Sequence, residues 1–159
     1  MQSVNADQRI LGYLGRGLSL EYSAVQLYST QARLVEAWGL AEVARKFNAE
    51  AIEEMGHADR IISRMLALGV APNASQLRPV RLGRNLQELL QANHAFESEV
   101  VRLYEDAMKH SASVGDHDSR LFFEALHGEE SQHARHMLDW LRRLQDVSTS
   151  VSGDRKSVV

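Results

Sequence analysis

The only two prolines of this 159-residue chain, Pro72 and Pro79, lie close together near its middle. Because proline interrupts helices, this confinement leaves the residues on both sides free to be helical. Apolar residues recur on both sides at steps of three and four, the period of an amphipathic helix. The sequence therefore predicts an all-α fold divided by one connector.

The apolar pattern predicts four long helices, over about residues 7–38, 40–68, 84–113 and 118–146. Polar capping residues and glycines mark their ends: Asn5 or Asp7 before the first helix, Gly39 and Gly115 in short turns, and Asp116 or Asp118 before the last helix. The connector over residues 70–83 is much longer than either turn. Two short turns around one long connection predict a four-helix bundle of two antiparallel hairpins joined by a long crossover.

A glutamate interrupts the apolar seam of each predicted helix near its middle. Two of these acids are 33 residues apart, and so are the other two: Glu21 and Glu54, then Glu97 and Glu130. Each pair is centred on a predicted turn, so each acid lies roughly 24 Å from its turn at 1.5 Å per residue. All four carboxylates should therefore meet in one layer, where burial requires a compensating charge such as a metal ion.

Two of the four glutamates are followed one helical turn later by a histidine, in Glu54-x-x-His57 and Glu130-x-x-His133. Positions i and i+3 share a helix face, so each pair can bind one ion. Four carboxylates and two imidazoles suit two iron or manganese ions, while zinc is harder to exclude. A third copy, Glu124-x-x-His127, lies off the seam, and we interpret it as part of a solvated helix face.

Composition excludes several other kinds of protein. The chain has no cysteine, which excludes disulfides and cysteine-ligated iron–sulfur clusters. A formal net charge of −3 gives no reason to expect nucleic-acid binding, and no apolar run is long enough to predict a membrane span. The first seven residues are polar and lack a basic-then-apolar signal. We therefore expect a cytoplasmic protein.

The motifs of the second and fourth helices resemble those of the ferritin superfamily and, within it, the bacterioferritin family most closely. The segment Glu54-Met55-Gly56-His57-Ala58-Asp59 is similar to that family's E-M-x-H-A-D motif, and Glu130-x-x-His133 to its second E-x-x-H. The resemblance implies a ferritin-like di-iron bundle over residues 1–147. The polar tail, 148–159, departs from the family, because it contains no clear match to that family's short fifth helix. It implies two iron ions per subunit, with six ferroxidase ligands: Glu21, Glu54, His57, Glu97, Glu130 and His133.

The resemblance also makes Met55 an axial ligand to haem b at a two-fold dimer interface. Helical geometry places Met55 about 100° from Glu54 and about 160° from His57, away from the metal layer. Packing against a partner subunit is the alternative role for its thioether. Dimers would assemble to a 24-subunit cage, with a ferredoxin-type protein as a possible reductant.

The function expected from the resemblance is ferroxidase activity, in which dioxygen or hydrogen peroxide oxidises Fe(II) to Fe(III) for mineral storage. Three alternatives stay open: a di-iron peroxidase or oxygenase, a haem-binding electron-transfer dimer, and a structural bundle without metal.

Two tyrosines and two acids close to the predicted layer have less certain roles. Tyr28 and Tyr104 each follow a layer glutamate by seven residues, so each hydroxyl could approach the metal or serve the core with one hydrogen bond. Ala49 stands where many bacterioferritins have a histidine of an additional inner-surface iron site. Nearby, Glu50 and Glu53 could still attract iron weakly.

Overall fold

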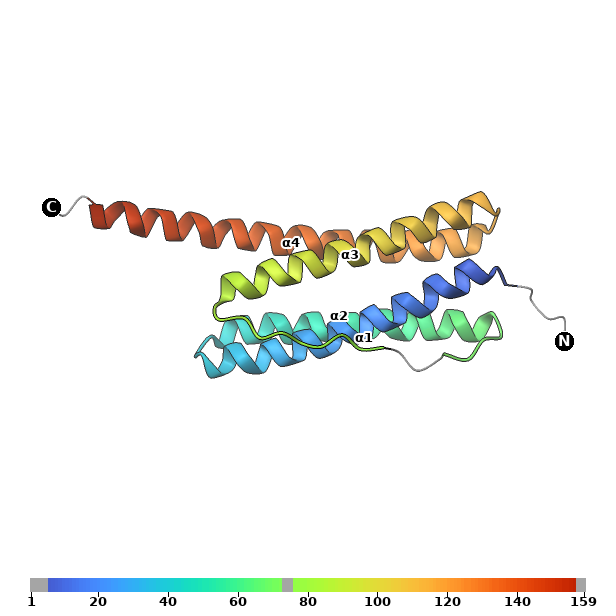
Figure 1. Cartoon of the computed structure of the whole chain (residues 1–159), viewed down its shortest axis with the longest axis horizontal. Helices are drawn as coiled ribbons and strands as arrows, with labels where there is room; N and C mark the ends of the chain where they lie inside the picture. The colour runs from blue at the N-terminus through green and yellow to red at the C-terminus, as the bar shows by residue number, and fades with distance from the viewer. Residues whose placement is uncertain (1–5, 73–75, 157–159) are drawn as a thin grey trace.

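The computed structural model describes residues 6–72 and 76–156, of which 148–156 are described by their backbone only. It contains four helices, α1 (Gln8–Ala37), α2 (Ala41–Ala67), α3 (Leu86–Ser113) and α4 (His117–Lys156), and no strand within the described residues. Helices α1 and α2 form one antiparallel hairpin, α3 and α4 form the other, and an extended crossover runs along the bundle between them (Figure 1). The predicted all-α bundle and its topology are confirmed.

Polar caps and turn glycines fix the helix boundaries close to their predicted places. Asp7 accepts hydrogen bonds from the backbone N–H groups of Arg9 and Ile10, and Asn85 caps α3 in the same way through Glu88. Asp116, directly before α4, accepts a hydrogen bond from the backbone N–H of Ser119 in the first turn of that helix. Gly39 and Gly115 take φ values of 83° and 73° in the two short turns, a conformation that other residues rarely adopt. Asn5, the other predicted cap of α1, lies outside the described residues.

Helix α4 is longer than its apolar pattern predicts. The pattern places its end near Asp146, but the backbone stays helical to Lys156 and extends past the other three helices (Figure 1). No proline interrupts this segment, and its glycine Gly153 costs a helix only about 1 kcal/mol. No separate fifth helix follows within the described residues, and residues 157–159 of the predicted tail lie outside them.

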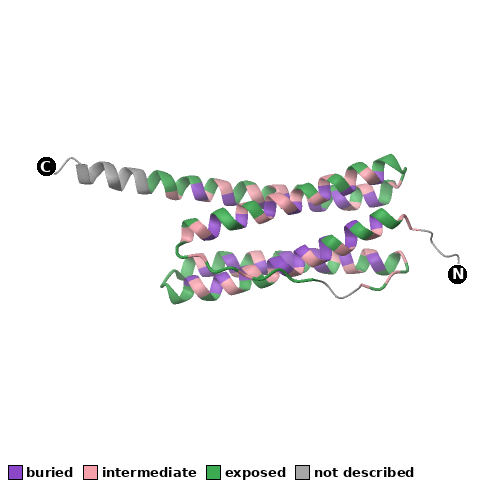
Figure 2. Cartoon of the chain, in the orientation of Figure 1, coloured by how far each residue is buried: buried purple, intermediate pink, exposed green. Residues whose placement is uncertain are grey.

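Buried residues follow the inward faces of the helices (Figure 2). Their apolar side chains form two clusters rather than one. One cluster contains Leu14, Tyr104 and Phe123, and the other contains Tyr28, Phe47 and Leu90. Along every helix, the residues of one cluster are separated from those of the other by a short polar stretch that holds a predicted site residue. The core is therefore cut by one polar layer at mid-height. Within residues 6–72 and 76–156, no helix combines the length and apolar character needed to cross a membrane.

Candidate metal centre

All six predicted ligands lie together in the polar layer, and each is at least nine-tenths buried. The four glutamates come one from each helix, whereas the two histidines come from α2 and α4. The six side chains are Glu21, Glu54, His57, Glu97, Glu130 and His133. The helical period and equal distances from the turns therefore bring together residues that are far apart in the sequence.

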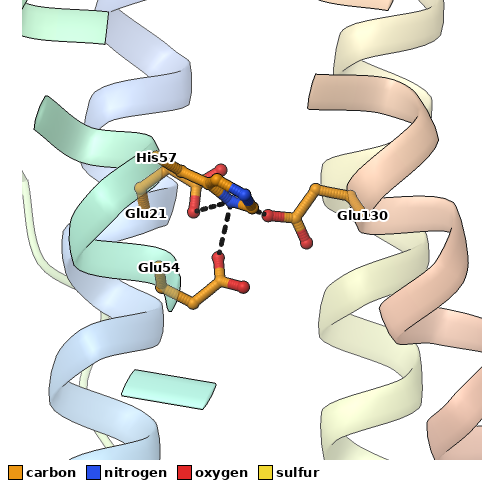
Figure 3. Close-up of side chains that lie close together, drawn as sticks. All are labelled: Glu21, Glu54, His57 and Glu130. Atoms are coloured by element: carbon orange, nitrogen blue, oxygen red, sulfur yellow. Dashed lines mark hydrogen bonds and ion pairs between the residues drawn. The ribbon is translucent and has the colours of Figure 1, made fainter. Parts of the chain in front are cut away.

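Two overlapping groups of side chains in this layer each offer four ligand atoms within 4.8 Å of one another. One group is Glu21, Glu54, His57 and Glu130 (Figure 3), and the other replaces Glu21 and His57 with Glu97 and His133. Glu54 and Glu130 belong to both groups. The geometry thus offers two neighbouring cation positions that share two carboxylates.

The histidines connect the two hairpins across the layer. His57 Nδ1 lies 2.7 Å from Glu130 Oε1, and His133 Nδ1 lies 2.9 Å from Glu54 Oε1. Burial alone lowers the pKa of His57, but hydrogen bonds to Glu130, Glu21 and Glu54 outweigh it and raise that pKa to about 12. The same balance raises the pKa of His133 to about 11. Without a cation, both imidazoles are therefore protonated.

Burial has the opposite effect on most of the carboxyl groups. It raises the pKa of Glu97 well above the ordinary value, and it also raises the pKa values of Glu21 and Glu54. Burial also acts to raise the pKa of Glu130, but hydrogen bonds with Glu97, His133 and His57 lower it. Burial thus favours the protonated form of Glu21, Glu54 and Glu97, and a bound cation would displace such protons.

Several buried atoms in the layer have no partner with good hydrogen-bond geometry. They are Oε2 of Glu21, Glu97 and Glu130, Oε1 of Glu54, and Nδ1 of His133. Two of them, Glu54 Oε1 and His133 Nδ1, face each other at 2.9 Å without that geometry. A buried carboxylate oxygen without a donor is costly, and cation binding is a usual compensation. Oxygen and imidazole donors without thiolate suit iron or manganese, so the residues present fit a di-iron group.

Two buried tyrosines hold the unshared carboxylates from the opposite hairpin. Tyr104 on α3 donates its hydroxyl hydrogen to Glu21 Oε1 at 2.6 Å, and Tyr28 on α1 donates to Glu97 Oε1. Each bond occupies one oxygen of its glutamate and leaves Oε2 for the layer. Spacing along one helix could place the phenols near the layer, but it could not show that each bonds the glutamate of the other helix.

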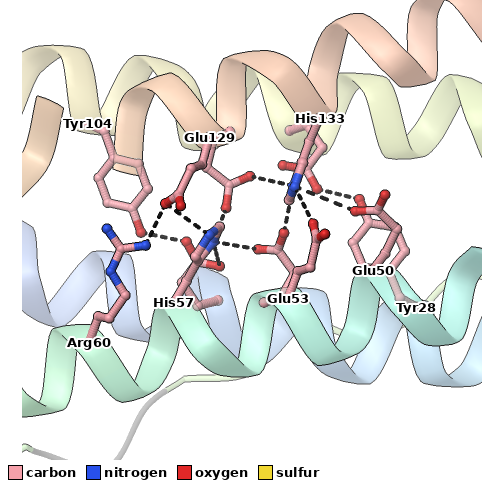
Figure 4. A network of polar contacts seen from close by, with 12 residues as sticks. Tyr28, Glu50, Glu53, His57, Arg60, Tyr104, Glu129 and His133 are labelled. Atoms are coloured by element: carbon pink, nitrogen blue, oxygen red, sulfur yellow. Dashed lines mark hydrogen bonds and ion pairs between the residues drawn. The ribbon is translucent and has the colours of Figure 1, made fainter. Parts of the chain in front are cut away.

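An open cleft of about 400 Å³ lies over the layer between α2 and α4. Glu53, His57, Glu129 and His133 line it. Glu50 and Glu53 also form a third group of candidate ligands with His133, although Glu53 is exposed (Figure 4). Glu129 did not emerge from the sequence because it lies off the buried seam.

Two other predicted features lie outside the layer. Met55 is on α2 but is 40% exposed, in agreement with its predicted place on a different side of the helix from Glu54 and His57. Glu124 of the third E-x-x-H copy is exposed and pairs with Arg120 on its own helix, at 3.0 Å. It belongs to neither cation group of the layer.

Comparisons with known proteins agree with the fold and the arrangement of the layer. A family model described as a ferritin-like domain matches residues 11–147. A bacterioferritin of Rhodobacter capsulatus is 40% identical over 130 residues, which cover 82% of this chain and 81% of that protein. A bacterioferritin of Brucella melitensis biotype 1 is 30% identical over 152 residues, which cover 96% and 92%.

A solved structure of the Rhodobacter capsulatus bacterioferritin has a metal-free dinuclear site and haem iron in a crystallographic special position. It matches this fold with a TM-score of 0.85 and 37% identity, over 89% of this chain and 88% of that chain. The chain therefore belongs to the bacterioferritin family of ferritin-like proteins.

Proposed function

We propose that this protein stores iron by oxidising Fe(II) to Fe(III) in the carboxylate layer. One observation carries the proposal: four buried carboxylate oxygens, one from each helix, accept no hydrogen bond of good geometry in a layer that also holds two histidines. A structural polar layer would be expected to pair these oxygens with donors. Membership of the bacterioferritin family supports the same conclusion.

The ligand sets divide naturally between two ferrous ions. Glu54 and Glu130 would contact both ions, with Glu21 and His57 completing one set and Glu97 and His133 the other. Two bound ferrous ions supply two electrons, which reduce dioxygen or hydrogen peroxide. The rigid helices keep the ligands together, and the two apolar clusters limit the access of water along the bundle axis, which leaves the cleft as the open side of the layer.

The chain also provides an acceptor for a proton that binding would displace. His133 must lose its Nδ1 proton to bind a cation through that atom. Glu50 Oε2 lies 3.6 Å from His133 Nδ1, and burial raises the pKa of Glu50 to about 7. Glu50 can therefore accept this proton near neutral pH.

Haem binding and cage assembly are the other parts of the proposal. Helix α2 leaves Ile52, Met55 and Leu66 exposed, and the 11-residue interval between Met55 and Leu66 returns to nearly the same side of the helix. Such an apolar surface suits a partner subunit. The haem iron of the Rhodobacter capsulatus structure supports Met55 as a haem ligand. A pyridine haemochrome assay should show haem in the wild type and its loss in Met55→Leu.

The central experiment adds Fe(II) aerobically to metal-free protein and follows ferric absorbance, with size-exclusion light scattering on the same sample. We expect rapid oxidation of about two irons per chain on a large particle. Glu54→Ala and Glu130→Ala should each lose this phase, because each residue belongs to both cation groups. Glu124→Ala is the matched control from the third E-x-x-H copy and should oxidise normally. Normal oxidation rates in both layer variants would refute the proposal.

A further inference from the structure

Two exposed glutamates stand at the cleft beside the buried ligands. Glu53 directly precedes Glu54, and Glu129 directly precedes Glu130, so the chain contains Glu-Glu-x-x-His twice. The side chains of Glu53 and Glu129 are 57% and 49% exposed. Neither belongs to the two cation groups that share Glu54 and Glu130.

Each exposed glutamate reaches the histidine of the opposite helix (Figure 4). Glu129 Oε2 on α4 lies 3.4 Å from Nε2 of His57 on α2. Reciprocally, Glu53 Oε2 on α2 lies 2.5 Å from Nε2 of His133 on α4. Since Nδ1 of each ring faces a buried glutamate, both imidazoles lie between a carboxylate of the layer and a carboxylate of the cleft.

A neutral imidazole that binds a cation through Nδ1 carries its remaining proton on Nε2. A carboxylate that accepts this proton fixes the tautomer, orients the ring and makes the ligand atom more basic. We propose that Glu53 and Glu129 are positioning residues that hold His133 and His57 with Nδ1 directed at the two cations. This inference rests on the proposed function, because it concerns the same cation site.

The two positioning residues are held differently. Arg60, one turn after His57, donates a hydrogen bond to Glu129 Oε2 at 2.5 Å. Within the described residues, no arginine or lysine contacts Glu53 in this way. The cation beside His57 should therefore depend on Arg60, and the cation beside His133 should not.

Calorimetric titration of metal-free, full-length protein with Co(II), together with the visible Co(II) spectrum, tests the inference. We expect Glu129→Gln and Glu53→Gln each to lower the affinity for one of the two cations by about 10- to 100-fold. Glu124→Gln, an exposed glutamate on α4 away from the layer, is the matched control and should bind both cations normally.

Histidine backgrounds distinguish positioning from a general loss of negative charge. In a His57→Ala background, Glu129→Gln should not lower the affinity for the remaining cation, which lies beside His133, whereas Glu53→Gln should lower it. The reverse should hold in a His133→Ala background. Equal effects of both glutamine variants in both backgrounds would overturn the inference in favour of a general electrostatic effect.

An arginine pair adds a second test. Arg60→Gln should lower the affinity for the cation beside His57 several-fold. Arg64 lies one turn further along α2 and donates a hydrogen bond to Ser119, so Arg64→Gln should leave this affinity unchanged. If the wild type binds no Co(II), the proposed function itself is wrong. If the wild type binds two Co(II) ions and both glutamine variants match it in affinity and spectrum, only the positioning role is wrong.

Discussion

Two groups of polar side chains are buried in the core. One group is fully hydrogen-bonded, whereas the other is not. Gln31 on α1 and Asn93 on α3 exchange two hydrogen bonds, at 2.8 and 2.7 Å, and leave no side-chain atom unpartnered. The glutamate layer has comparable burial but retains several oxygens without donors. Burial of a polar group therefore does not by itself indicate function, whereas the unpaired acceptors of the layer support the proposed cation site.

The largest expected effect comes from Glu97→Gln, which changes a layer ligand with almost no change of shape. Burial raises the pKa of Glu97 well above its ordinary value and so favours the neutral carboxyl form, which glutamine resembles. We expect the melting temperature of the metal-free protein to stay within about a degree or two of the wild type, since glutamine has nearly the shape of the neutral carboxyl group and leaves no cavity. The affinity for one cation should fall by at least about 100-fold in Co(II) calorimetry, because a ligand matters more than its supporting residues.

Glu97→Gln also tests the comparison directly. If this variant melted much earlier than the wild type without metal, the layer would be a structural network like the amide pair. The appropriate control is Glu88→Gln, an acid near the start of the same helix that pairs with Arg84 rather than with the layer.

Much of this contrast could be predicted from the sequence, because it depends on helical period. The layer could be located from the equal separations of the two glutamate pairs, which fix height in each hairpin. The helix boundaries followed from caps and turn glycines. These features are set by residues close together or regularly spaced in the sequence, so the sequence alone is enough to predict them.

The missed features depend on how helices cross in space. The bonds from Tyr28 to Glu97 and from Tyr104 to Glu21 join the two hairpins, and spacing along one helix cannot specify them. Gln31 does not belong to the apolar pattern that predicts the first helix, so its hydrogen bonds with Asn93 could not be predicted either. The predicted end of α4 was wrong, because its final residues continue the helix without the apolar period from which a helix is predicted.

Single substitutions in the amide pair should be costly where a double substitution is not. Gln31→Leu leaves the Asn93 amide buried without its partner and should cost about 1–3 kcal/mol of unfolding free energy. Replacing both residues with leucine removes both polar groups and should recover most of that loss. Denaturant unfolding of the metal-free protein measures both values, and Co(II) affinity should stay unchanged throughout. A double variant as unstable as the single one would show that shape, not hydrogen bonding, governs this site.

The two polar groups should also differ in their response to pH. The folded metal-free protein keeps protons on His57 and His133, with pKa values of about 12 and about 11, while the unfolded chain releases them near 6.5. Above pH 6.5 the folded state therefore holds more protons, and its stability should fall as pH rises toward 11. The slope is at most about 1.4 kcal/mol per pH unit for each histidine.

Thermal melting in the presence of a chelator, between pH 6.5 and 9, measures this slope. A protein saturated with Co(II) should reverse the trend, because cation binding displaces the same protons and strengthens with pH. The Gln31→Leu variant should keep the wild-type slope, since neither amide titrates. A melting temperature that rises with pH in the metal-free protein would contradict protonated histidines in the layer.

The smallest expected effect is that of Tyr104→Phe, which removes one hydrogen bond from Glu21 without removing a ligand. Tyr104 is fully buried and donates at 2.6 Å, so its loss frees Glu21 Oε1 to rotate away from the cation. We expect about tenfold weaker Co(II) binding on the side of His57, the lower end of the range for residues that support a ligand. Tyr28→Phe should weaken the other cation to a similar degree, because its bond to Glu97 is the reciprocal one. Equal weakening of both cations by either variant would show that the phenols act on the whole layer and not on one carboxylate each.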